Sequence, residues 1–163
     1  IAIPNAGGPP AGTFEELDSD QWDRAYQLTL RSAVTFAAAV RQHLDRGGAM
    51  LYLTSASVKE PIGILVLSNV FRAGVAALAK SLATEWAPYG IRVNAIAPGY
   101  MDTPMARPFF DDPRYGALWT DAIPMKRPGR PEELAPVAVL LASEASSYMT
   151  GATVVIDGGY CAW

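Results

Sequence analysis

Apolar residues recur at steps of three and four between Gln21 and about Asp45, which predicts a helix with a single buried stripe. Asp18 or Asp20 is the expected N-cap of this helix, and Gly47-Gly48 is expected to end it. The stripe consists of Trp22, Tyr26, Leu30, Ala33, Ala37 and Val40.

Two further segments show the pattern of a helix. The first runs from about Leu67 to Trp86, with an apolar stripe, and Pro88 and Gly90 follow it. The second begins at Pro131, a favourable residue for a first helical turn, and runs to about Ala142. Pro136 lies inside it, and we expect this residue to remove a hydrogen bond or to kink the helix.

Short apolar runs separate these helices and predict strands at 1–3, 49–54, 91–97 and 152–156. Strands that alternate with helices indicate an α/β fold with a parallel sheet and crossover helices. Ligands bind such sheets at the carboxyl ends of the strands. Those ends are Asn5-Ala6-Gly7, Thr54-Ser55, Pro98-Gly99 and Asp157-Gly158-Gly159, and we expect the chemistry at the first three.

The segment 98–125 has no clear periodicity and contains several prolines. So long an irregular stretch is typical of a functional loop, so we expect a substrate lid with a short helix inside it. Trp119 lies in this segment and either covers a substrate pocket or packs in a subunit interface.

Length and composition restrict the class of protein. The 163 residues suffice for one domain, spanning 1–163, and the net charge of −3 argues against binding of nucleic acid. Cys161 is the only cysteine and His43 the only histidine, so we expect no internal disulfide and no metal site. The apolar runs are too short or too interrupted to predict a membrane span, and no signal-peptide pattern is present. We therefore expect a soluble, cytoplasmic chain, with His43 at the surface and an unreactive Cys161.

Several segments together resemble the short-chain dehydrogenases/reductases, close to the 3-oxoacyl-carrier-protein reductases. They are Asn5-Ala6-Gly7, the serine in LYLTSAS, and the blocks AALAKSLATEWAPYGIRVNAIAPGYMDTPM and GRPEELAPVAVLLASEASSYMTGATVVIDGGY. The resemblance implies the later part of a Rossmann-like, doubly wound parallel sheet, starting at the family's fourth strand. The family's first two βα units, with their Gly-rich phosphate loop, are absent, and no G-x-G-x-x-G pattern occurs. The chain is then a fragment, a truncated product or one piece of something larger.

The same resemblance implies an oxidoreductase that uses NAD or NADP on a small carbonyl or alcohol substrate. The residues that choose between the two cofactors would precede Ile1. Helices at the Leu67 and Pro131 positions form subunit interfaces in the family, so a homo-oligomer is expected. By matching the family's motifs, the cofactor contacts would be Asn5, Ala6, Gly7, Arg72, Pro98, Gly99 and Thr103.

The family's catalytic positions are Asn, Ser, Tyr and Lys, and they correspond here to Thr29, Ser55, Ser68 and Arg72. Only the serine is retained. A phenol has a pKa of about 10 and can be tuned toward neutrality, whereas an aliphatic hydroxyl cannot. Arg72 stays charged and can orient a ribose or a carbonyl, but it cannot replace the missing acid. Tyr100 is a candidate substitute acid.

Each of these residues also has a structural interpretation. Ser55 can cap a turn, Ser68 can be the N-cap of the second helix, and Arg72 can be an exposed helix charge. Asn5-Ala6-Gly7 and Pro98-Gly99 can be turns at strand ends. A subgroup of the family has segments resembling NAGGPP and VKEPIGILVLSNVFRAG, so the Ser68/Arg72 pair is either its own pattern or a decayed site.

Three functions therefore stay open at the level of sequence. The first is a nicotinamide-dependent oxidoreductase. The second is a catalytically inactive binding or assembly module that keeps the fold. The third is a fragment without a function of its own, whose first strand would be an exposed edge prone to aggregation.

Overall fold

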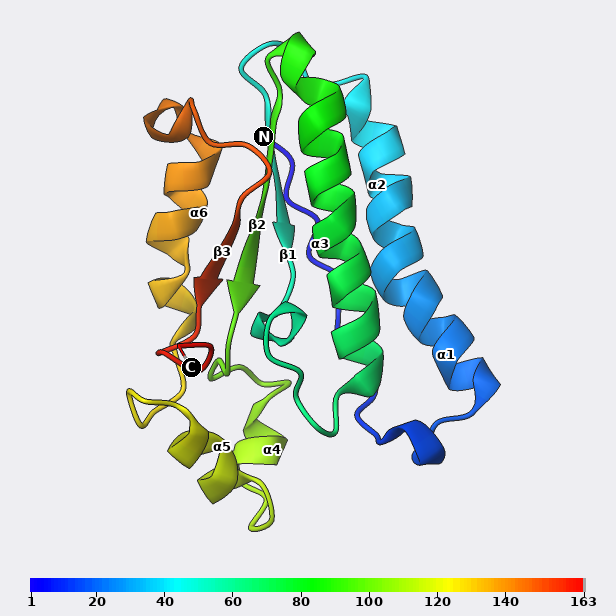
Figure 1. Ribbon diagram of the computed structural model, residues 1–163, viewed down its shortest axis with the longest axis vertical. Helices are drawn as coiled ribbons and strands as arrows, with labels where there is room; N and C mark the ends of the chain where they lie inside the picture. The colour runs from blue at the N-terminus through cyan, green and yellow to red at the C-terminus, as the bar shows by residue number, and fades with distance from the viewer. Residues whose placement is uncertain (163) are drawn as a thin grey trace.

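A parallel sheet lies between two helical layers in the computed structural model, which describes residues 1–162 (Figure 1). Within these residues the strands are β1 (Ala49–Leu53), β2 (Arg92–Pro98) and β3 (Thr153–Ile156), in the order β1-β2-β3. Both strand pairs are parallel, with Tyr52 opposite Ala95 and Ile96 opposite Val154. The predicted α/β fold with a parallel sheet is confirmed.

The predicted strand at 1–3 is reduced to a single parallel bridge between Ala2 and Met50. The amide of Ala2 donates to the carbonyl of Ala49 at 2.8 Å, and the amide of Leu51 donates to the carbonyl of Ala2 at 2.9 Å. Pro4 cannot donate a further ladder bond, so the pairing stops there. The segment has the predicted place but is too short to count as a strand.

The first predicted helix forms as one continuous run with a wide turn in its middle. It comprises α1 (Ser19–Ala25), the π-helical turn η2 (Tyr26–Arg31) and α2 (Ser32–Arg41), and it ends before the predicted Asp45. Asp18 is the N-cap, because its carboxylate accepts from the amide of Gln21 at 2.8 Å while the Gln21 side chain accepts from the amide of Asp18 at 2.9 Å.

The long helix α3 (Val66–Trp86) packs on the same face of the sheet as α2 (Figure 1). Side chains alternate along a strand, so Met50 and Tyr52 point toward α2 and α3. Among the described residues, Val66–Tyr89 alone is long and apolar enough to cross a membrane, with a mean hydropathy of 1.2. Its residues Val75, Ala79, Ala83 and Trp86 are buried in the core with the strands, whereas 28% of its apolar window as a whole is buried.

The opposite face of the sheet is covered by α6 (Ala135–Ala142), which follows the 3-10 turn η5 (Pro131–Glu133). Leu141 of α6 packs there with Leu51 and Ile96 of the strands. The predicted helix over 131–142 is interrupted at Leu134, two residues before Pro136, in agreement with the break expected near this proline. The helix begins at Ala135, so this proline stands in the first turn, where its missing N–H is not needed.

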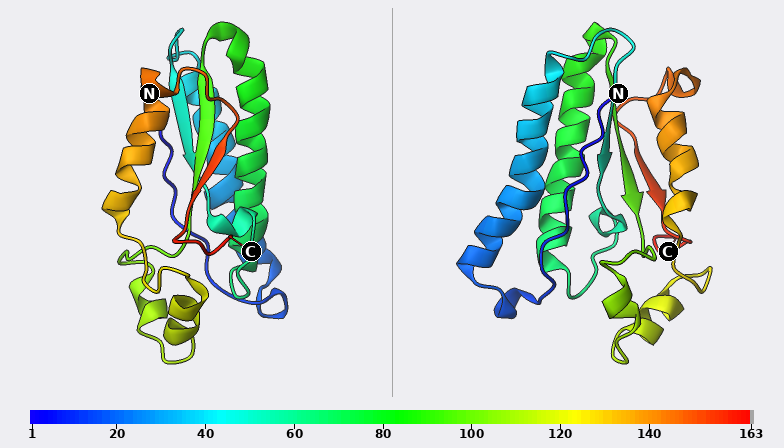
Figure 2. Two further views of the ribbon diagram at one scale, coloured as in Figure 1. Left: turned by 60° about the vertical axis from the view of Figure 1, so that its left-hand side comes forward. Right: turned by 180° about the vertical axis from the view of Figure 1, so that it is seen from behind.

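The segment 98–125, for which the sequence predicts a lid and which is called the lid segment below, lies beyond the carboxyl ends of the strands, as the two further views show (Figure 2). It holds two short helices, α4 (Arg107–Phe110) and α5 (Gly116–Ala122), where the sequence predicted one. The remaining short 3-10 turns are η1 (Phe14–Glu16), η3 (Ala56–Val58), η4 (Ala87–Tyr89) and η6 (Glu144–Ser146).

Candidate functional site

Ser55 stands at the carboxyl end of β1 and begins the turn η3. Its hydroxyl oxygen accepts from the amide of Ser57 at 3.1 Å, so the turn-capping interpretation of Ser55 is confirmed. The hydroxyl proton has no acceptor among the described residues and remains able to donate. The neighbouring Thr54 is buried and donates from Oγ1 to the carbonyl of Ile96 at 2.9 Å, which ties β1 to β2.

Ser68 and Arg72 are four residues apart on α3, so they share one face of the helix. The helix begins at Val66, and its N-cap is Leu65, which makes no side-chain capping bond. The alternative interpretation of Ser68 as the N-cap is therefore wrong. Its hydroxyl is half-buried in the first turn of α3, at the end that faces the strand termini.

Arg72 connects three parts of the chain. Its Nη1 donates to the carbonyl of Leu53 at 2.8 Å, and its Nη2 donates to the carbonyls of Ala6 and Gly7 at 3.4 and 3.3 Å. The side chain is half-buried, and burial lowers the pKa of the guanidinium. The interpretation of Arg72 as an exposed helix charge is wrong, since the residue binds the first loop to the end of β1.

The loop at Asn5-Ala6-Gly7 contributes its backbone to this arrangement. Its carbonyls accept from Arg72, so it does make the structural hydrogen bonds of the alternative interpretation. Asn5 and Gly7 are exposed, and a Cβ built on Gly7 would have no heavy atom within 4 Å. The loop therefore leaves open space at the carboxyl edge of the sheet.

Thr29 is placed apart from these groups. It lies in the π-helical turn η2, is only 2% exposed, and its hydroxyl has no hydrogen-bond partner. Within residues 1–162, no hydrogen bond connects Thr29 with Ser55, Ser68 or Arg72. Thus Ser55 and Arg72 are brought to one strand end, whereas Thr29 has no polar link to them.

Pro98-Gly99 ends β2 where the backbone of the next strand comes close. A Cβ on Gly99 would lie 2.6 Å from the Cβ of Asp157 and 2.7 Å from its Cα, so only glycine fits. Asp157 in turn accepts from the amides of Gly159 and Cys161 at 2.9 and 2.7 Å. Thr103 begins the lid, and its Oγ1 accepts from the amide of Ala106 at 3.3 Å.

Tyr100 is held in an aromatic cluster under the lid. Its ring centroid lies 4.8 Å from that of Trp119 and 5.2 Å from that of Tyr160. Burial, together with the neighbouring Tyr160, raises the pKa of the Tyr100 phenol. The phenol therefore stays protonated near neutral pH and is hard to ionise, which weakens its case as a substitute acid and base. Tyr160 was missed from the sequence, although it follows the strand-end motif Asp157-Gly158-Gly159 directly.

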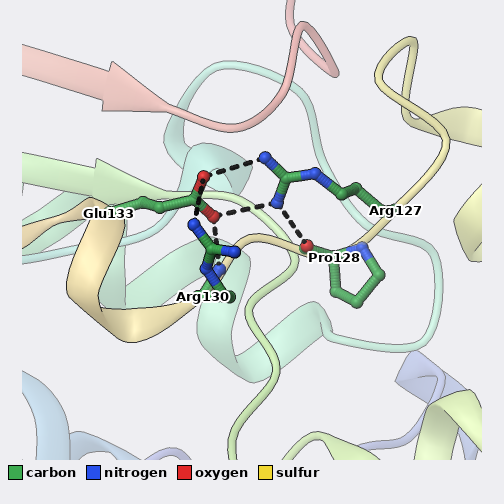
Figure 3. Close-up of polar contacts among 4 residues, drawn as sticks. All are labelled: Arg127, Pro128, Arg130 and Glu133. Atoms are coloured by element: carbon green, nitrogen blue, oxygen red, sulfur yellow. Dashed lines mark hydrogen bonds and ion pairs between the residues drawn. The ribbon is translucent and has the colours of Figure 1, made fainter.

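A hollow near these strand ends does not include the predicted catalytic residues. A cavity of about 380 Å³ opens at the end of β3, between the lid and η5, and it includes none of Ser55, Ser68 and Arg72. Glu133 on its wall accepts from Arg127 at 2.8 and 2.9 Å and from the amide of Arg130 at 2.8 Å (Figure 3). These bonds lower the pKa of Glu133 to about 2 and fix the start of α6.

The residues present fit the nicotinamide end of a dinucleotide. Three features lie at the same edge of the sheet. They are the open loop at Gly7, the close approach of Gly99 to Asp157 that only glycine allows, and the cation of Arg72. A Gly-rich phosphate loop does not occur in the sequence. In the described part of the chain, no cluster of three His, Cys, Asp or Glu side chains could hold a metal ion. His43 is exposed, and burial raises the pKa of the Cys161 thiol to about 11, so this thiol stays protonated.

Comparisons with known proteins identify the fold and the family. A family model described as Enoyl-(Acyl carrier protein) reductase matches residues 1–161. The 3-oxoacyl-(acyl-carrier-protein) reductase FabG of Chlamydia pneumoniae is 36% identical over 161 residues, which cover 98% of this chain and 64% of the relative. An NADP-dependent mannitol dehydrogenase of Hypocrea jecorina is 38% identical over 162 residues, covering 97% of this chain and 60% of the relative.

Among solved structures, the gluconate 5-dehydrogenase of Burkholderia cenocepacia, in complex with NADP and tartrate, superposes with a TM-score of 0.93 at 28% identity. The match covers 99% of this chain and 64% of that protein. The chain thus spans about three fifths to two thirds of the length of these relatives. On this evidence the chain belongs to the short-chain dehydrogenase/reductase family.

Proposed function

We propose that this chain forms the nicotinamide-binding and substrate-binding part of an oxidoreductase that interconverts a carbonyl and an alcohol with NAD or NADP. The observation that carries the proposal is the contact of Arg72 with Leu53, Ala6 and Gly7. It brings α3, the end of β1 and the first loop together at the edge where ligands bind parallel sheets. Because the chain spans only part of its relatives, the activity of the whole protein is part of the proposal.

When bound, the nicotinamide would supply the hydride chemistry. The protein's own part is to hold the reactants and to move a proton. Ser55 would donate its free hydroxyl proton as a hydrogen bond to the substrate oxygen. Pro98, Gly99 and Thr103, with the loop at 5–7, would border the nicotinamide. Ser68 cannot act as the acid, because its hydroxyl has no accessible pKa near neutrality.

The substrate class is supported only broadly. The relatives' names include an acyl-carrier-protein reductase, a mannitol dehydrogenase and a gluconate dehydrogenase, which all act on carbonyl or hydroxyl carbons of different molecules. A reductase of 3-oxoacyl-carrier-protein type is therefore one member of the proposed class. The choice between NAD and NADP stays open, although one structural neighbour holds NADP.

Self-association and a cytoplasmic location are further parts of the proposal. The helix α6 is apolar on nearly every side, yet Val139 and Leu140 on its outer face are exposed. On α3, Val70 is also exposed. Such apolar faces favour contact with a second copy of the chain, and sedimentation velocity of the purified protein measures it.

A catalytically inactive binding module is the second candidate function. It is favoured by one specific observation, namely that a serine hydroxyl at position 68 stands where the family has a phenol. In this case the cofactor would bind but the carbonyl would not be reduced.

The test restores the family's pair in the full-length protein. In Ser68→Tyr/Arg72→Lys, an ammonium four residues from the phenol lowers the pKa of that phenol. If position 68 limits the reaction, reduction of an uncharged carbonyl substrate should rise about 100-fold or more, the usual contribution of a general acid. Ser81→Tyr, on the exposed side of the same helix, is the control. A double variant that binds NADPH and gains no activity over an inactive wild type would contradict the oxidoreductase proposal.

A further inference from the structure

The charge of Arg72 is not balanced by an acidic side chain. Its described hydrogen bonds all go to backbone carbonyls, those of Leu53, Ala6 and Gly7. No ion pair within residues 1–162 joins it to a carboxylate. A guanidinium that is withdrawn from water in this way loses hydration, which backbone carbonyls replace in part and an anionic partner replaces more strongly.

Other guanidiniums at the same end of the molecule are neutralised. Arg107 pairs with Asp102 at 2.8 Å and Arg114 with Asp112 at 2.7 Å in the lid. Near η5, Arg127 pairs with Glu133 at 2.8 Å. These three side chains are largely exposed and still have partners. The half-buried Arg72 is thus set apart from them by both its burial and its unbalanced charge.

Arg72 also keeps donors for a ligand. A guanidinium has five N–H donors, and the contacts with the three carbonyls leave at least two of them over. Among the described residues, the buried side-chain groups without a partner are the hydroxyls of Thr29 and Ser57. The Nε of Arg72 has no partner among the described hydrogen bonds and is not one of these buried groups, so this donor reaches solvent, where a ligand can meet it.

The position of these donors relates them to Ser55. The carbonyl of Leu53, which accepts from Arg72 at 2.8 Å, belongs to the residue two before Ser55 in the chain. The Ser55 hydroxyl accepts from the Ser57 amide and still has its own proton to donate. The same strand end thus carries a neutral donor, Ser55, and a cation bonded to the backbone two residues before it, Arg72. A molecule that carries a carbonyl or hydroxyl oxygen and, near it, a carboxylate matches this pair.

We propose that Arg72 binds the carboxylate of the substrate, so that the enzyme acts on a hydroxy acid or oxo acid rather than on an uncharged polyol. The inference rests on the proposed function, and it names the substrate class for that site. A planar guanidinium is suited to carboxylate because it can bind both oxygens at once. The phosphate of a nucleotide is the other source of the same anionic chemistry, and the test separates the two.

The experiment measures binding by calorimetry with the full-length protein and two probes, gluconate and sorbitol, in the presence of NADP. These probes share their carbon skeleton and differ by a carboxylate against a hydroxymethyl group. We expect the wild type to bind gluconate at least ten-fold more tightly than sorbitol. Added salt should weaken the binding of gluconate and leave the binding of sorbitol unchanged. In Arg72→Gln the preference should vanish, while Arg72→Lys should keep part of it. Arg24→Gln, at an exposed position of α1, is the matched control.

Each contrary outcome is distinct. Equal binding of gluconate and sorbitol by the wild type overturns the inference. This comparison needs no variant, so the inference stays testable even if Arg72→Gln fails to fold. An unchanged gluconate preference in a folded Arg72→Gln also overturns it. If that variant loses affinity for NADP but not for gluconate, the anion is the nucleotide phosphate and the carboxylate assignment is wrong. Failure of the wild type to bind either NAD or NADP would instead contradict the proposed function itself.

Discussion

At the scale of single residues, two arginines show that the same type of side chain can have a structural role at one position and lie at the proposed ligand site at another. Arg92 is 8% exposed and donates to the carbonyls of Leu141 and Ser143 and to the hydroxyl of Ser146. It therefore holds the last turn of α6 against β2, where the free carbonyls of a helix end attract a cation. Arg72 also binds carbonyls, but it keeps donors directed to solvent at the ligand edge.

The structural role of Arg92 gives a clear prediction. Arg92→Ala would leave the buried carbonyl of Leu141 without its described partner and would remove the charge-assisted bonds to Ser143 and Ser146, which stay bonded to each other, at a cost in free energy. We expect the free energy of unfolding, measured by urea denaturation, to fall by about 3 kcal/mol. Arg24→Ala, at an exposed position, should change it by less than about 0.5 kcal/mol. A loss below about 1 kcal/mol in Arg92→Ala would show that water replaces the guanidinium there.

Residue chemistry limits what the sequence could predict of the site. The strand-end positions of Ser55 and Gly99 follow from the pattern of strands, and the structure places both there. The contacts of Arg72 with Ala6 and Gly7 span more than sixty positions of the chain and depend on how α3 packs. No local pattern carries that information. For the same reason the sequence left an exposed Arg72 and an N-capping Ser68 as alternatives, and both are wrong.

At the scale of elements, the start of α6 depends on the Glu133 carboxylate. This group accepts from Arg127 and from the amide of Arg130, which closes the turn η5 in front of the helix (Figure 3). The sequence placed Pro131 correctly at this start. It also predicted a disruption near Pro136, and the break between η5 and α6 lies at Leu134, although helical periodicity alone did not give its position.

The Glu133 contacts predict a dependence of stability on pH. The pKa of Glu133 lies at about 2 in the folded chain, below its ordinary value of 4.5. A lowered pKa means that the folded state favours the carboxylate, so this stabilisation is complete above about pH 5 and is lost as the pH falls toward 2. We expect the melting temperature of Glu133→Gln to lie a few degrees below that of the wild type at pH 7. At pH 2 the two melting temperatures should be equal.

Glu132→Gln is the matched control, since Glu132 is the exposed neighbour and has no ion pair in the described residues. Differential scanning calorimetry at the two pH values measures the effect. A melting difference in Glu133→Gln that persists unchanged at pH 2, or that is absent at pH 7, would count against this role for the carboxylate.

At the scale of the whole molecule, most of the architecture was predictable. Three parallel strands and the order of helices follow from runs of apolar residues that either alternate or repeat every three to four positions. The π-helical turn at Tyr26–Arg31 did not follow, because it leaves the apolar spacing of the long helix almost unchanged. The two helices α4 and α5 did not follow either, because the segment 98–125 has no clear periodicity. The resemblance to the family predicted the residues of the candidate site, and the structure shows how they are arranged.

The central claim is that the edge formed by the first loop, Arg72 and Gly99 binds a nicotinamide cofactor. The most direct measurement is a titration of the folded protein with NADH and with NADPH, followed by energy transfer from its four tryptophans to the reduced nicotinamide. The account predicts saturable transfer with at least one of the two cofactors, and weaker binding in Gly99→Ala, where a Cβ would meet the backbone of Asp157. A folded protein that shows no saturation with either cofactor up to millimolar concentration would contradict it.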